Sequence, residues 1–339
     1  MKKKRVLIVG GAGFIGHNLA IKLKKLKHKV SIVDSLQINN ILWLKKNKDQ
    51  LPFPDLSMSI LKERFRLLKN FKIPLIKTDA RDYKKLSRVF HKVKPEIIIH
   101  LAAVSHANKS NKDPFSTFDH SLRTLENSLD HSKNKLFNVK QFIFLSSSMV
   151  YGNFKKKAVN EKDICKPLGI YAALKLSGEN IIKAYNQVFG LPYTIIRPSA
   201  LYGERCISRR VGQIFIENII NNKEISIQGD GLEKLDFTYI DDLVNGIICA
   251  INSKKALNQT FNLTYGNAQP IYKLINILKK NFSNVKVKHI KRDKLMPKRG
   301  TLSNSKAKKL INYKPKWPIH KGYSQYINWY KTQFKNFKK

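Results

Sequence analysis

Short apolar runs alternate with helical patterns over the first 200 residues of the chain. The runs have no polar face, which is typical of strands that are buried on both sides in a parallel sheet. They lie at residues 5–9, 29–33, 73–77, 95–100, 141–145 and 193–196. The helical patterns lie at residues 15–24, 56–68, 83–92, 114–131 and 171–189. This alternation predicts a doubly wound α/β fold, in which ligands bind beyond the carboxyl ends of the strands.

The alternation ends after residue 197, and the pattern becomes less regular. Helices are predicted at 211–220, 241–251, 271–280, 305–310 and 323–334, and short strands at 225–227 and 261–263. We therefore expect two domains. The first comprises residues 1–197 and about 232–262, and a smaller, mixed α/β domain comprises about 198–231 and 263–339.

A glycine-rich segment, Gly10-Gly11-Ala12-Gly13-Phe14-Ile15-Gly16, joins the first strand to the first helix. Its glycines allow a tight turn and the approach of a pyrophosphate, while the helix N-terminus offers free N–H groups. The second strand ends in Asp34, a carboxylate that can accept hydrogen bonds from an adenosine ribose. No arginine follows it directly to bind a 2′-phosphate. This context predicts a Rossmann-type dinucleotide site that prefers NAD to NADP.

Composition limits the remaining possibilities. At 339 residues the chain is long enough to bury a sizeable core. Cys165, Cys206 and Cys249 have no metal-ligand spacing and no disulfide pattern, which is typical of a reducing compartment. No apolar run reaches the roughly 18 residues of a membrane helix. We expect a cytoplasmic protein with no metal site and no membrane partner.

The formal net charge of +42 is the unusual property of this composition. Such a charge can indicate binding to nucleic acid, an anionic membrane or acidic substrates. The lysines are scattered through every segment, however, and the aromatic stacking platforms of single-strand binders are missing. A chain-wide amino-acid bias therefore explains the charge better than a specific nucleic-acid partner. A basic nucleic-acid-binding protein on a dehydrogenase scaffold stays as the alternative from a different class.

Tyr171 and Lys175 lie one helical turn apart on the same face of a predicted helix. A tyrosine has a pKa near 10, and a neighbouring lysine together with an oxidised nicotinamide favours the phenolate that a general base requires. Ser147 follows the preceding strand, where its hydroxyl could orient a substrate oxygen. These three residues are the predicted catalytic group.

The motifs together resemble the extended short-chain dehydrogenases/reductases of the NAD-dependent epimerase/dehydratase group, which act on nucleotide sugars. The resemblance runs through GGAGFIG, Asp34, DARD, HLAA, SSSMVYG, YAALK, RPSALYG, DFTYIDD and the late KRG segment. It implies an NAD-binding first domain, a substrate-binding second domain and catalysis by the predicted group. The cofactor residues that it implies are Gly10, Gly13, Phe14, Ile15, Gly16, Asp34, Ser35, Asp79, Ala80, Leu101, Ala102, Ala103, Ser105, Tyr171, Lys175 and Pro198.

Two departures from the family pattern bear on the substrate and the reaction. Family dehydratases and decarboxylases usually carry an acid where this chain has Ser148 and Met149, so epimerisation of a nucleotide-linked sugar is favoured. A keto-sugar reductase is the alternative, and a dehydratase is less favoured. Many members also hold the diphosphate with an arginine where this chain has Leu235. The substrate residues that we expect are Ser147, Ser148, Arg209 and Arg299, with Arg210 as a further candidate cation.

The resemblance also implies a homodimer. Relatives use a pair of helices that match residues 114–131 and 171–189 to form a four-helix interface. Leu122, Leu125 and Leu129 place an apolar stripe on the first of these helices, although packing within one chain would explain that stripe equally well.

Overall fold

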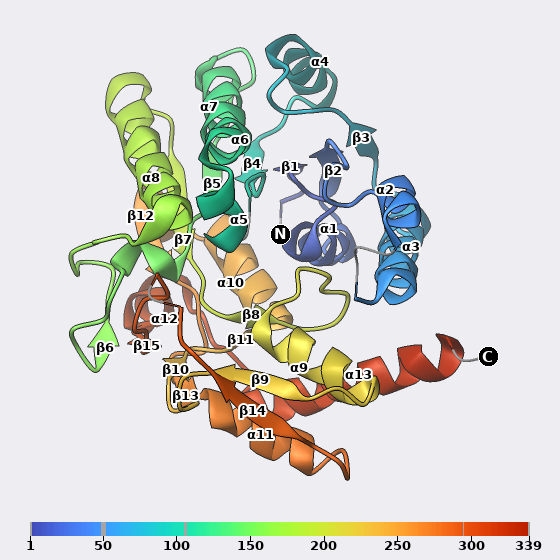
Figure 1. Ribbon diagram of the computed structural model, residues 1–339. Helices are drawn as coiled ribbons and strands as arrows, with labels where there is room; N and C mark the ends of the chain where they lie inside the picture. The colour runs from blue at the N-terminus through green and yellow to red at the C-terminus, as the bar shows by residue number, and fades with distance from the viewer. Residues whose placement is uncertain (1, 49–51, 105–106, 294, 338–339) are drawn as a thin grey trace.

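A seven-stranded parallel sheet forms the centre of the computed structural model, which describes residues 2–48, 52–104, 107–293 and 295–337 (Figure 1). The strand order is β12-β7-β5-β4-β1-β2-β3, and every neighbouring pair is parallel. The strands are β1 Arg5–Val9, β2 Lys29–Asp34, β3 Leu75–Lys77, β4 Ile97–His100, β5 Gln141–Leu145, β7 Tyr193–Arg197 and β12 Gln259–Asn262. The predicted doubly wound fold is confirmed.

Alternate residues of the strands bury themselves in two different cores, one on each face of the sheet. Val6 and Ile8 of β1 pack with the helices α1 and α10. Leu7 and Val9 pack on the other face with α4, α7 and α8. The bounds of these helices are α1 Phe14–Lys25, α4 Tyr83–Val93, α7 Thr124–Lys133, α8 Gly169–Phe189 and α10 Ile240–Asn252. Two-sided burial explains why the strands lack a polar face.

The helical segment after β4 is less regular than its sequence pattern predicts. It consists of α5 Ala107–Lys112, α6 Pro114–Phe118, a π-helical turn η2 Asp119–Arg123, and α7. Leu125 and Leu129 are fully buried and pack in the core of the sheet face that α7 covers. Their stripe is therefore explained by packing within the chain and provides no support for a dimer interface.

An inserted segment lies beside α1 at the β3 edge of the sheet (Figure 1). It contains α2 Ile41–Lys46 and α3 Pro54–Asn70. Leu44 of α2 packs with Met58 and Leu61 of α3, and Ile207 from a distant loop joins this cluster. The insertion thus packs against a segment that follows the short strand β8, Leu201–Tyr202.

The later part of the chain forms a mixed α/β region, in the lower half of Figure 1. Its strands pair in short two-stranded units: β8 with β11, β9 with β14, β10 with β13, and β15 with β6. The bounds are β6 Ala158–Val159, β8 Leu201–Tyr202, α9 Val211–Ile220, β9 Ile225–Gln228, β10 Lys234–Leu235, β11 Thr238–Tyr239, η4 Lys254–Ala256, β13 Gln269–Pro270, α11 Ile271–Lys279, β14 Val287–Ile290, β15 Thr301–Leu302, α12 Ser305–Ile311 and α13 Ile319–Phe337. The apolar residues of this region are continuous with the core beneath α1.

Candidate active site

The glycine loop between β1 and α1 provides a cradle at the carboxyl edge of the sheet. Gly10 has a φ of +78°, and a Cβ there would lie 2.6 Å from the backbone nitrogen of Ala102. A Cβ on Gly16 would lie 2.5 Å from the backbone of Gly11. At Gly13, in contrast, the nearest atom to a Cβ is a carbonyl oxygen at 3.5 Å. The loop is therefore tightly packed at Gly10 and Gly16, and it has open space at Gly13.

Gly13 is also the N-cap of α1, and no side chain caps the first turn of that helix. Its N–H groups and the positive end of the helix dipole are available to an anion. The open space and the free donors fit the pyrophosphate of a dinucleotide, held by Gly13, Phe14, Ile15 and Gly16.

Asp34 at the end of β2 is buried and fixed by backbone donors. Its Oδ2 accepts from the Ala12 amide at 3.0 Å, and its Oδ1 accepts from the Leu36 amide at 2.8 Å. Burial raises the pKa of this carboxyl, and the two amides oppose that effect. Ser35 follows at the mouth of the cradle, where its Oγ accepts weakly from the Gln37 amide at 3.4 Å. This position fits the expected ribose site.

The predicted adenine residues lie just after the end of β3, where an arginine engages one of them. The Arg81 guanidinium binds the Asp79 carboxylate, with Nη2 2.7 Å from Oδ2, and lowers the pKa of Asp79. The same guanidinium pairs with Asp119 of η2 at 2.7 Å. The Ala80 carbonyl accepts from the Asn127 side chain at 2.9 Å. Because its carboxylate is paired with Arg81, Asp79 helps to fix the loop that follows β3.

The other predicted cofactor residues come from the ends of β4 and β7. The Leu101 amide donates to the Val9 carbonyl at 2.8 Å, which holds Ala102 and Ala103 beside the glycine loop. The Pro198 carbonyl accepts from the Ser148 amide at 2.9 Å. Ser105 lies outside the described residues.

The predicted catalytic residues come from elements that adjoin at the end of β5. Lys175 is 7% exposed, and its Nζ donates to the Leu145 carbonyl at 2.7 Å. Ser147, two residues further along, caps the short helix η3 Ser148–Tyr151 with its Oγ accepting from the Met149 amide at 3.2 Å. Tyr171, on the same helix as Lys175 and one turn earlier, is half-buried. Helix α8 packs against η3, so the phenol, ammonium and hydroxyl groups come from adjoining elements.

Burial of the Lys175 ammonium lowers its pKa to about 8, although the nearby Glu179 carboxylate opposes this effect. The ammonium also lies 4.9 Å from the centre of the Phe144 ring. At pH 7 Lys175 is therefore still mostly protonated and carries a positive charge at the end of β5.

A buried ion pair supports the catalytic residues from below. Glu179 is fully buried one turn after Lys175, and Arg197 at the end of β7 donates to it from Nε at 2.9 Å and from Nη2 at 2.6 Å. Ser146 donates to the same carboxylate at 2.5 Å. The guanidinium lies 4.8 Å from the Tyr151 ring centre. This network ties β5, β7 and α8 together, and sequence reasoning missed it.

A second missed residue is His100, at the end of β4. Its ring stacks with Phe142 at 6.1 Å and with Phe144 at 6.2 Å between ring centres. Burial and the Lys175 charge lower the pKa of His100 to about 3, so the ring is neutral. It forms part of the apolar wall behind the lysine.

Arg299 lies within the electrostatic reach of Arg210, Arg292 and Tyr171. Burial and the charges of Arg210 and Arg292 lower the pKa of Arg299 to about 10, while Tyr171 opposes the change. Arg299 has no hydrogen bond or ion pair with any other residue that the structure describes. The buried Nε of Arg210 likewise has no partner within the described ranges. Arg292 pairs with Glu233.

The segment before β15 brings Arg299 to this place. The Lys298 amide donates to the Asn153 side chain at 2.7 Å, and the Lys298 carbonyl accepts from the Phe154 amide at 2.8 Å. Arg209, in contrast, is paired with the buried Glu217 at 2.8 Å. Arg299, which was expected to bind the substrate, thus lies near Tyr171. Arg209, which was also expected to do so, is instead paired with Glu217. Its neighbour Arg210 lies near Arg299 in its place.

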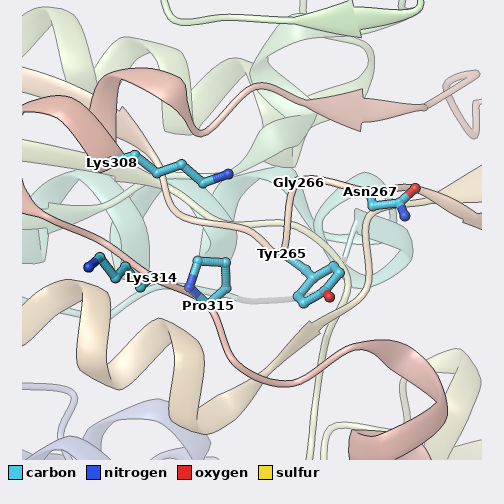
Figure 2. Close-up of a pocket in the computed structure, with 6 residues that line it drawn as sticks. All are labelled: Tyr265, Gly266, Asn267, Lys308, Lys314 and Pro315. Atoms are coloured by element: carbon cyan, nitrogen blue, oxygen red, sulfur yellow. The ribbon is translucent and has the colours of Figure 1, made fainter.

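A separate hollow of about 360 Å³ opens on the surface beyond β12 (Figure 2). Figure 2 labels the residues that line it: Tyr265, Gly266, Asn267, Lys308, Lys314 and Pro315. None of the predicted site residues is among them. Within the described part of the chain, no group of three or more His, Cys, Asp or Glu residues could hold a metal ion. In the same part, no helix combines the length and apolarity that crossing a membrane requires.

Comparison with known proteins identifies the family. The model of the NAD dependent epimerase/dehydratase family matches residues 6–264. The chain belongs to this family. It is 30% identical to Protein CapI of Staphylococcus aureus, with 98% of this chain and 99% of that protein covered. The predictions of an NAD-dependent enzyme and of the family are confirmed.

Solved structures agree with this assignment. UDP-glucuronic acid 4-epimerase from Bacillus cereus, in complex with UDP-glucuronic acid and NAD, is 27% identical with a TM-score of 0.85, and 96% of this chain and 99% of that chain are covered. UDP-glucose 4-epimerase from Thermotoga maritima, with UDP-glucose, is 25% identical with a TM-score of 0.82, and 97% and 99% are covered. These relatives confirm the prediction of a nucleotide-sugar epimerase.

Proposed function

We propose that this protein interconverts UDP-linked hexoses that differ in configuration at C4, with UDP-glucuronic acid as the first candidate substrate. The observation that carries the proposal is the grouping of Ser147, Tyr171 and Lys175 at the end of β5, beside a glycine cradle that fits NAD. Relatives that act on UDP-glucuronic acid and UDP-glucose support the choice of sugar nucleotide.

The residues of the chain have distinct roles in this reaction. Tyr171 removes the proton of the C4 hydroxyl and later returns it, and Ser147 donates a hydrogen bond to the same oxygen. Bound NAD would supply a hydride acceptor and return the hydride to the opposite face of the carbon. Lys175 keeps a positive charge beside the phenol. No acidic side chain stands at position 148 or 149 to protonate a leaving hydroxyl, which favours epimerisation over elimination.

Arg299 and Arg210 are the proposed ligands of the substrate diphosphate. Both have donors without partners in the described chain, and the charge of Arg210 contributes to lowering the pKa of Arg299. An anion between them would relieve that repulsion and make charge-assisted hydrogen bonds. Arg299 and Arg210 would then replace the arginine that is absent at Leu235. Ser148, which is fully buried, would act through its backbone contact to Pro198.

The two-domain division is proposed on the same basis. Residues 1–197 and about 232–262 would bind NAD, because β12 completes the central sheet and α10 packs on α1. The remaining segments, about 198–231 and 263–339, would bind the sugar nucleotide, because they carry Arg210 and Arg299.

We also propose a homodimer in the cytoplasm. Phe115 is 88% exposed and Phe118 is 52% exposed on α6, which packs beside α8. Burying these rings between two copies would remove a large apolar area from water. The three free cysteines fit a reducing compartment. A monomeric mass by light scattering at micromolar concentration would contradict the dimer.

The decisive experiment supplies purified protein with a trace of NAD and a panel of UDP-sugars, and follows the sugar configuration by NMR. Epimerisation predicts many turnovers per NAD and an equilibrium mixture of two sugars that differ at C4. A requirement for one NADH per product would favour the keto-sugar reductase instead. Tyr185→Phe, on the same helix as Tyr171, is the control and should keep full activity.

A further inference from the structure

The loop 203–210, between β8 and α9, has an unusual backbone. Gly203 has a φ of +139°, Arg205 of +64° and Arg209 of +47°. Non-glycine residues in the left-handed region are strained and persist where surrounding contacts fix them. The contacts of this loop therefore identify what holds it in place.

The Arg205 side chain reaches across to the first turns of α1. Its Nε donates to His17 Nε2, its Nη2 donates to Asn18 Oδ1, and its Nη1 donates to Glu63 Oε1 of α3, each at 3.3 Å. Burial, with the charge of Arg64 as the next cause, lowers the pKa of His17 well below its usual range, so the ring is neutral and can accept from Arg205.

His17 and Asn18 are in turn bonded to the cofactor cradle. The His17 Nδ1 lies 2.8 Å from the Gly13 carbonyl oxygen, and the Asn18 side chain donates to the Phe14 carbonyl at 2.9 Å. His17 and Asn18 therefore connect Arg205 to Gly13, the N-cap of α1, and to Phe14, its first residue.

Arg64 of α3 binds the backbone of the same loop. It is 1% exposed, and its Nε and Nη2 both donate to the Arg205 carbonyl. Its Nη1 donates to Asn39 at 3.0 Å and to the Ala12 carbonyl of the glycine loop at 3.4 Å. Within the described chain this buried cation has neutral hydrogen-bond acceptors and no bonded carboxylate, an expensive arrangement. Its contacts join the loop directly to the cradle.

The other end of the loop leads to the substrate side. The Arg209 amide donates to Gln213 at 2.8 Å, and the Arg209 side chain pairs with Glu217, so the start of α9 is fixed. Arg210 follows immediately and is near enough to Arg299 for its charge to lower the pKa of Arg299. Arg205 and Arg210 thus belong to one short loop, through which the position of Arg205 bears on that of Arg210.

We propose that Arg205, backed by Arg64, is a positioning residue that couples the two binding sites: it latches the loop carrying Arg210 to the first turns of α1, so that a nucleotide held by Arg210 slows the release of NAD. The inference rests on the proposed function, because that function assigns Arg210 to the substrate diphosphate. By linkage, NAD strengthens nucleotide binding by the same factor.

The test uses the holoenzyme and UDP as the nucleotide probe. The rate at which NAD leaves the protein is followed by capture with alcohol dehydrogenase and ethanol, with and without saturating UDP. UDP should slow release about 5- to 100-fold in the wild type and in the control Arg66→Met, which removes an exposed arginine from α3, the helix that carries Glu63 and Arg64. In Arg205→Met the effect should fall below about twofold. Equal slowing in Arg205→Met and wild type would overturn the proposal, as would UDP that binds the wild type without slowing release.

Hydrogen exchange separates this inference from the proposed function, since it needs no nucleotide. NAD loading should slow exchange of the 203–210 amides in the wild type and leave them unchanged in Arg205→Met. Equal protection in both proteins would overturn the latch. If neither UDP nor dTDP binds by calorimetry, the proposed function fails, and the exchange result still decides the latch. Should Arg205→Met not fold, Glu63→Gln, which removes the carboxylate that pairs with Arg205, replaces it in both measurements.

Discussion

Lys175 carries a predictable energetic penalty in the folded protein. Burial lowers its pKa from 10.5 to about 8. Because a tenfold change in a protonation equilibrium is about 1.4 kcal/mol, keeping this lysine charged at pH 7 costs the fold about 3 kcal/mol. Lys175→Met keeps most of the side-chain volume and removes the charge. The variant should therefore gain stability from the lost penalty, while turnover collapses because the phenol loses its positive neighbour.

The pH dependence gives the sharpest form of this prediction. Between pH 8 and pH 10.5 the unfolded chain binds the proton on Lys175 and the folded chain does not. Wild-type stability consequently rises with pH in this window relative to the variant. From pH 7 to pH 10 the difference in unfolding free energy between the two proteins should change by about 2.5 kcal/mol in favour of the wild type. Loss of the Lys175 hydrogen bond to Leu145 shifts the difference in unfolding free energy by a constant amount, so its dependence on pH is unchanged.

Urea unfolding of cofactor-stripped wild type and Lys175→Met, in half-unit steps from pH 7 to pH 10, measures this slope. Comparing the two proteins at each pH cancels the titration of the other lysines. Lys183→Met removes a charge from the same helix and serves as the control. A difference that stays constant within about 0.5 kcal/mol over the whole range would refute the argument that burial of the ammonium dominates.

Three further predictions concern single residues. Tyr171→Phe should lower turnover by about 10²- to 10⁴-fold while NAD remains bound, as measured by NMR and by cofactor absorbance. Glu179→Gln should lower the free energy of unfolding in urea by about 3–5 kcal/mol, because it leaves a buried arginine without its carboxylate. The control Glu224→Gln, which breaks an exposed ion pair with Lys288, should change it by less than about 1 kcal/mol. Gly10→Ala should unfold at a markedly lower urea concentration, because its Cβ would lie 2.6 Å from a backbone nitrogen. Gly13→Ala has open space for its Cβ and should keep wild-type stability, while its affinity for NAD, measured by calorimetry, should fall.

The central strands could be predicted well because their residues are buried on both faces. The predicted runs at 5–9 and 141–145 coincide with β1 and β5, and the helix expected at 211–220 coincides with α9. In each case local sequence and tertiary burial agree. The short helices α2 and α5 have six residues each, too few to show a periodic pattern, and they were missed.

The place of β12 in the sheet could not be predicted from local pattern. A strand was expected at 261–263, and the observed strand is Gln259–Asn262. Its pairing with β7 depends on where the chain returns after a long excursion, which periodicity does not encode.

The candidate site was predicted where motifs are contiguous and missed where partners are distant. The glycine loop, Asp34 and the Tyr171–Lys175 pair each lie within one short segment. Arg205, in contrast, meets partners 142 to 188 residues away, so only the folded chain reveals its role. Glu179 carried a usable signal, since it lies four residues after Lys175 and thus on the same helix face.

The late return of β12 has a consequence for synthesis of the protein. Until residues 259–262 have left the ribosome, β7 is an unpaired edge whose peptide groups can bind another extended chain. The nascent polypeptide must therefore wait, with most of its sheet formed, for a segment that comes after the 203–210 loop, α9 and α10. Ribosome pausing within residues 198–258 should expose this edge, and a fragment that ends at residue 258 should aggregate where the full chain stays in solution.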